Sequence, residues 1–259
     1  MVERLIHFGG EKVKIEFFST IQGVSATFPI TYARDTLPAW VATARADYLQ
    51  TNKAEQHVYK CPGIFDILTT GYIVHAWHDI QVDTNTGKMT AYAPTVEMEN
   101  LLGQPPLQVQ GSNGTAKHLP KRPWSHGDIL KINTPWHVFA PKGVKLMMLP
   151  LPYTNNFTFE TCSGILDPGI ASEVNIQAYC NVSGNFTIKA GTPIAQLIPL
   201  SEKSFDIEVR DMTSSDSQWV NKRRYLNAFS YVLNRKKLKE AYDAHVSSSK
   251  CPITKFWKN

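Results

Sequence analysis

Between residues 57 and 204 the chain is a succession of short runs rich in β-branched and aromatic residues, each followed by a turn-forming segment. The runs include KMTAYA, VKLMMLPL, VNIQAYCNV and IAQLIPL, and the segments between runs include TNTG, SHGD, DPG and KAG. Glycine in each segment permits the turn conformations that join short strands. Many short strands at this spacing are typical of a sandwich, a barrel or a jelly-roll-like body. We therefore predict a mainly β domain over residues 56–205.

Helices are expected on both sides of this β domain. Residues 1–55 contain the strand-like run VKIEFF at 13–18 and the run AWVATARADYLQ, which predicts a helix that begins near Thr36 with Pro38 in its first turn. Residues 206–259 contain a long helical pattern that begins near Asp216 or Ser217. The sequence thus predicts an N-terminal arm, a β domain and a basic C-terminal α-helix and tail.

The net charge of +5 comes from the C-terminal segment. From residue 216 onward there are ten lysines and arginines and three acidic residues, so this segment carries +7 and the rest of the chain −2. Leu226, Phe229 and Leu233 share one side of the expected helix, which predicts an interface with the β domain or with a neighbouring subunit. The basic residues between 222 and 239 offer an alternative, namely electrostatic binding of nucleic acid.

Composition and motifs exclude several other classes. With 42% hydrophobic and 19% charged residues, the chain is expected to fold as an ordinary globular protein. Its four cysteines form no C-x-x-C pair, and there is no P-loop, dinucleotide fingerprint or serine nucleophile motif. We find neither a signal-peptide core nor a run of roughly 18–20 apolar residues, so we expect a cytoplasmic protein that is not secreted through a signal peptide and does not enter a membrane.

Asp167 lies in the segment GILDPGI, where Pro168 presets φ and Gly169 tolerates a tight turn. A carboxylate in this position has two possible roles. It can accept hydrogen bonds from the amides of the turn, which is the commoner role of Asp in turns. It can also project into a crevice between subunits and activate water.

The block from residue 163 to 200 resembles a known superfamily. The order GILDPG, then Glu173, then a strand ending at Asn181, then GTPIAQLI, is similar to the third and fourth motifs of the dUTPase and dCTP deaminase superfamily. The segment TTGYIVHAWHDI is a weaker echo of its first motif. The resemblance implies a dUTPase-like β-clip or jelly-roll-like barrel, a homotrimer, and a deoxynucleotide triphosphate bound between subunits.

Carried over to this chain, the resemblance implies that Asp167 activates the attacking water and that Gln196 lies near the phosphates. Gly71 and Tyr72 belong to the first motif, and Ile170 stands where the superfamily has a tyrosine that stacks on the pyrimidine.

Several departures from the superfamily count against catalysis. Ile73 replaces the aspartate of the first motif, and the segment LPLPYTNN lacks the expected arginine. A triphosphate needs dense positive charge around it. We therefore predict a non-catalytic assembly or interaction module with no cofactor. The alternative is a divergent nucleotide-binding or nucleotide-hydrolysing enzyme that uses Asp167 and Mg²⁺.

The segments DTLPAW and YKCPGIFDILTTGYIVHAWHDI also resemble uncharacterised proteins of tailed bacteriophages. This second resemblance implies a phage-encoded structural protein. Its expected partners are copies of itself and other virion proteins, and its expected location is the host cytoplasm or the virion.

Two further clusters of residues could either bind a ligand or serve the packing of the fold. His75, His78 and Asp79 are possible metal ligands, but on one strand residues three apart point to opposite faces, so we predict no metal site. Lys121, Arg122 and Trp124 lie in a basic loop that offers contacts to a phosphate backbone. A solvated loop anchored by its tryptophan is the more common arrangement.

Overall fold

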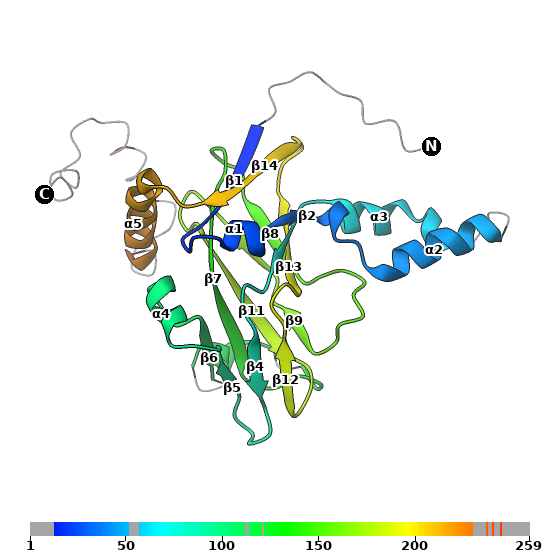
Figure 1. The fold of residues 1–259 in the computed structure, drawn as a ribbon, viewed down its shortest axis with the longest axis horizontal. Coiled ribbons are helices and arrows are strands. Elements are labelled where there is room, and N and C mark those ends of the chain that lie inside the picture. Colours follow the sequence, from blue (N-terminus) through cyan, green and yellow to red (C-terminus); the bar gives the residue numbers. More distant parts are fainter. Residues whose placement is uncertain are drawn as a thin grey trace, which may run out of the picture.

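The computed structural model describes residues 13–51, 57–111, 114–120 and 122–229, together with the single positions 237, 240 and 244. In this part of the chain fourteen strands form three sheets (Figure 1). The prediction of a mainly β fold is therefore confirmed. None of the described helices is long and apolar enough to cross a lipid bilayer.

The first sheet has six strands. Its main path runs through β14 (Phe205–Asp211), β1 (Val13–Ser19), β7 (Ile129–Phe139), β11 (Glu173–Cys180) and β9 (Phe159–Thr161), and β6 (Leu107–Gln110) also pairs with β7. β1 and β14 pair in parallel, and the other pairs are antiparallel. Strands from the expected arm and from the expected C-terminal segment therefore lie side by side in the main sheet.

The second and third sheets complete the β body. The second contains, in order, β10 (Gly164–Leu166), β8 (Leu146–Leu149), β13 (Pro193–Pro199), β3 (Tyr72–His75) and β2 (Thr31–Tyr32). The third contains β12 (Asn185–Ile188), β4 (Ile80–Asp83) and β5 (Thr90–Tyr92). Each sheet is open within the described residues, because none of these paths returns to its first strand.

One buried cluster joins the three sheets. β11 contributes Val174, Ile176, Ala178 and Cys180, which alternate with half-buried residues. Such alternation is expected of a strand with one face on the core. β7 is buried along most of its length because β1, β6 and β11 all pair with it. Each large apolar side chain buried here contributes roughly 1.5–3 kcal/mol of stabilisation.

The run YIVHAWHDIQV reads as one strand in the sequence, but it forms β3 and β4, which belong to different sheets. The chain leaves the second sheet at Ala76, whose N–H donates to Thr192 O and whose carbonyl accepts from Gly191 N–H. Trp77 then donates to Asn133 O of β7 over 3.2 Å. These contacts end one strand and redirect the chain to the next sheet.

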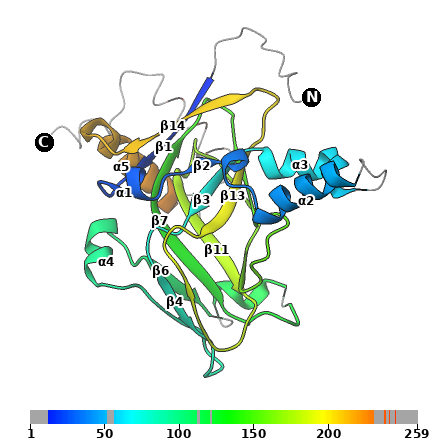
Figure 2. The same ribbon diagram turned by 45° about the vertical axis from the view of Figure 1, so that its right-hand side comes forward.

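A pair of helices projects from one side of the β body. α2 (Ala39–Gln50) confirms the helix predicted in this region, with Pro38 directly before it. α3 (Pro62–Thr69) was not predicted, and η2 (Val58–Lys60) precedes it. α2 and α3 lie side by side and extend away from the sheets in both views (Figures 1 and 2). We call these two helices the helical arm.

The remaining helices are short or lie near the termini. They are α1 (Val24–Thr27), η1 (Ala33–Asp35), α4 (Glu97–Leu102), η3 (Thr115–His118) and α5 (Ser214–Phe229). α5 confirms a helix in the C-terminal segment, and Asp216 lies in its first turn. The side chains of Leu226 and Phe229, and all of Leu233, lie outside the described residues.

Candidate functional site

The side chain of Gln196 contacts the segment that connects α3 to β3. Gln196 is on β13, opposite Ile73 of β3 and Leu149 of β8, and its side chain is buried. Its Nε2 donates to Ile67 O over 2.7 Å and to Thr70 O over 2.6 Å. The last carbonyls of a helix lack partners within the helix. Gln196 therefore caps the C-terminal end of α3.

Gly71 and Tyr72 lie beside this cap. Gly71 has φ +83°, and a Cβ built on it would lie 2.2 Å from Leu197 O. The Tyr72 ring is buried and meets Phe17 edge-on, with 5.4 Å between the ring centroids. Burial raises the pKa of Tyr72 well above its ordinary value. In this structure both residues serve the packing of β3 against its neighbours.

Asp167 follows β10, and β8 separates that strand from Gln196 on β13. Its Oδ1 accepts from Gly169 N–H over 3.0 Å, and its carbonyl accepts from the N–H groups of Ile170 and Ala171. Lys145 Nζ lies 3.5 Å from its Oδ2. The carboxylate thus supports the turn that it begins. Its role in activating water stays a prediction, as does the role of the half-buried Ile170 at a base.

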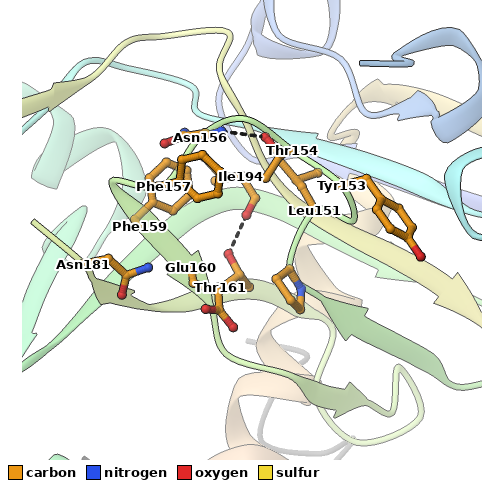
Figure 3. Close-up of a pocket in the computed structure, with 11 residues that line it drawn as sticks. Leu151, Tyr153, Thr154, Asn156, Phe157, Phe159, Glu160, Thr161, Asn181 and Ile194 are labelled. Carbon is orange, nitrogen blue, oxygen red and sulfur yellow. Dashed lines mark hydrogen bonds between the residues drawn. The ribbon is translucent and has the colours of Figure 1, made fainter. Parts of the chain in front are cut away.

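Two cavities adjoin the loop between β8 and β9. The larger has a volume of about 400 Å³ and is shown in Figure 3. Its lining residues come from the loop and from β9, β13 and Asn181: Pro150, Leu151, Tyr153, Thr154, Asn156, Phe157, Phe159, Glu160, Thr161, Asn181 and Ile194. The smaller, of about 180 Å³, lies at the base of the helical arm and includes Gln196 and Leu68 in its lining. Leu151 and Thr154 line both cavities.

The loop between β8 and β9 also holds the helical arm. Trp40 of α2 donates from Nε1 to Tyr153 O over 2.9 Å, and the two rings meet edge-on at 6.4 Å. Tyr153 has φ +52°, the one non-glycine residue of the described chain with positive φ. A bulky residue in this conformation is strained. No local pattern in the sequence indicates this contact, because 113 residues separate its partners.

α5 docks on the first sheet through aromatic and ionic contacts. Trp219 meets Phe18 and Phe139 edge-on, each at 5.8 Å between centroids. Arg224 Nε lies 2.9 Å from Glu173 Oε1, and Arg210 binds Asp216 at the start of the helix over 2.6 Å. The helical pattern predicted a docked helix, and the role of Leu226, Phe229 and Leu233 in an interface stays a prediction.

His137 of β7 is buried beneath this docking site. Its ring stacks on Phe18 at 5.5 Å, and Nδ1 lies 3.0 Å from Ser172 Oγ. Burial lowers the pKa of His137 to about 4, while the nearby charge of Glu173 acts in the opposite direction. The neutral imidazole is therefore part of the core at neutral pH.

The histidine cluster and the basic loop are held by local contacts. His75 Nδ1 lies 2.9 Å from Pro29 O and His78 Nδ1 2.7 Å from Asp79 O, while Asp79 pairs with Lys189 at 2.8 Å. The described residues contain no cluster of three or more His, Cys, Asp or Glu suited to a metal ion. Because the strand ends at His75, the alternation of faces expected from the sequence does not apply there.

In the basic loop, Arg122 pairs with Glu160 and lies over the Tyr179 ring, 4.4 Å from its centroid. Trp124 is 64% exposed, so it does not anchor the loop in the way that the sequence suggested. Lys121 lies outside the described residues.

A comparison with models of protein families finds no family that matches this chain, and a comparison with curated protein sequences finds no significant match.

Proposed function

We propose that this chain is a non-catalytic assembly module built on a dUTPase-like β-clip fold, and that a homotrimer is its working form. A phage-encoded structural protein is the most concrete version of this proposal. The resemblance of residues 163–200 to the superfamily supports the fold and the trimer. The helical arm supports assembly.

The observation that carries the proposal is the exposure of α2. Of its twelve side chains only Val41 is buried, and Leu49 near its end is 62% exposed. Isolated helices shorter than roughly 12–15 residues are marginal in water, so helices of this length depend on packing. A second copy that covers α2 would supply the missing burial, and symmetric oligomers commonly use such projecting elements.

The contacts of the expected catalytic residues favour the module over the enzyme. Gln196 Nε2 is engaged with two carbonyls of the α3 end, and Asp167 with the amide of Gly169. Arg122, a candidate phosphate ligand, is paired with Glu160. These groups would have to exchange their present partners in order to bind a triphosphate.

Light scattering during size-exclusion chromatography tests the proposal. We expect the full chain to elute with three times its 29.1 kDa mass, and we expect Leu49→Asp to shift it toward the single-chain mass, because a carboxylate would be buried in the contact. Val96→Asp is the matched control, since Val96 is 78% exposed on a different part of the surface. A wild-type chain that elutes as a monomer would refute the proposal. A Leu49→Asp variant that still elutes as a trimer would mean that the helical arm does not form the contact between subunits.

A further inference from the structure

The larger cavity, shown in Figure 3, combines an apolar side with a polar side. Phe157 and Phe159 lie on one side, and Asn181, Glu160 and Thr161 on another. Its volume of about 400 Å³ falls in the range of about 300–1,000 Å³ that is usual for small-molecule sites. The assembly proposal does not account for this arrangement.

Two features of the cavity are unfavourable for the protein in isolation. Phe157 is 74% exposed and Tyr153 is 54% exposed. Tyr153 holds φ +52°, a conformation that L-residues rarely adopt. Exposed aromatic rings and backbone strain gather at binding sites, where contact with a ligand offsets their cost.

The charges around the cavity indicate a neutral ligand. Glu160 is the acidic residue of its lining, and its carboxylate is already paired with Arg122. No lysine or arginine is among the lining residues. An anion such as a phosphate would therefore meet a carboxylate and no unpaired cation.

We propose that this cavity binds a neutral sugar, of the size of a mono- or disaccharide. A pyranose ring has an apolar C–H face, which packs on the ring of Phe157. Its hydroxyl groups both donate and accept, so they pair with the amide nitrogen of Asn181 and with the Thr154 hydroxyl, which accepts from Asn156 N–H and can still donate. The lining of this cavity does not include Asp167 or Gln196, and its test does not depend on the oligomer.

Saturation-transfer NMR on the full chain tests this proposal with glucose, galactose, mannose and N-acetylglucosamine as probes. We expect transfer from the protein to at least one of the four. Glucose 6-phosphate and galacturonate serve as charged analogues and should bind at least about tenfold more weakly than the matching neutral sugar. Transfer to none of the neutral sugars, or equal binding of the charged analogues, overturns the proposal.

One variant and its control locate the site. Phe157→Ala changes a largely exposed side chain, so the fold should persist while sugar affinity falls about tenfold. Tyr92→Ala is the matched control, because Tyr92 is 58% exposed and lies outside the cavity. If Phe157→Ala binds as tightly as the wild type, the sugar site is not here.

Discussion

Among the described glycines, Gly71 is the one at which an added Cβ would come closest to another atom. It joins α3 to β3 with φ +83°, and its Cα faces the carbonyl of Leu197 on β13. An L-residue in left-handed backbone costs about 1–2 kcal/mol. A side chain here would also overlap a backbone oxygen, which can move only if the paired strands separate.

We expect Gly71→Ala to lower the free energy of unfolding by more than about 3 kcal/mol, measured by urea denaturation. Gly87→Ala is the matched control. Gly87 has φ +73°, but no atom lies within 4 Å of an added Cβ, so only the conformational cost of about 1 kcal/mol should appear. Equal losses of unfolding free energy in the two variants would mean that the overlap with Leu197 O adds nothing to the cost at Gly71.

His137 should make stability depend on pH. Its folded-state pKa of about 4 lies below the ordinary 6.5, because burial opposes the charged form. The unfolded chain therefore binds the proton first as pH falls. The stability contributed by the neutral ring is present above pH 6.5 and is lost between 6.5 and 4, up to about 3 kcal/mol.

Urea denaturation between pH 7.5 and 4.5 measures this dependence. We expect His137→Gln to be less stable at pH 7.5 but to lose less stability on acidification than the wild type. Parallel curves for the two proteins would assign the acid sensitivity to other groups. His75 and His78, whose pKa values burial also lowers, are the first candidates for that role.

At the scale of elements, several of the described contacts between α5 and the first sheet share one centre. Trp219 meets Phe18 and Phe139, and Arg210 binds Asp216 and Glu16 while lying over the Phe18 ring at 5.2 Å. These contacts bring the helix, β1, β7 and β14 together. Loss of the indole should therefore loosen the helix as a unit.

We expect Trp219→Ala to speed hydrogen exchange of the α5 amides while β7 and β11 keep their protection. Trp124→Ala should leave both regions unchanged, because that indole is 64% exposed. Exchange that rises equally in β7 would mean that Trp219 belongs to the global core instead.

The sequence predicted those helices and strands that a local run of residues is enough to identify. β11 was predicted from the β-branched and aromatic run VNIQAYCNV between two turn segments, and α2 from the run after Pro38. α3 was missed because PGIFDILT is short and carries the aromatic and β-branched residues typical of strands. The division of β3 from β4 depends on contacts of Ala76 with distant residues, so no local pattern could reveal it.

In the candidate site, too, local motifs identified residues, but the contacts of these residues depend on distant segments of the chain. Motif resemblance led to Gln196 and Asp167, but amides and carboxylates that bind ligands also cap helices and turns. Which partners they take depends on α3 and on Lys145. The cavity of Figure 3 was not anticipated, because its lining comes from segments far apart in the sequence.

At the scale of the whole molecule, the β body and the helical arm differ in how they are stabilised. The body shares one buried cluster across three sheets. The arm extends beyond the sheets and is joined to the loop between β8 and β9 through Trp40 and Tyr153 (Figure 2). We propose that another copy of the chain covers α2.

Hydrogen exchange of the α2 amides, followed over a dilution series of the full chain, tests that claim most directly. β7 provides the internal reference, because its protection depends on the β body of one chain. We expect α2 to exchange slowly at high protein concentration and faster as the assembly dissociates, with β7 unchanged. Rapid exchange of α2 at every concentration would mean that no second copy covers it, and would contradict the account.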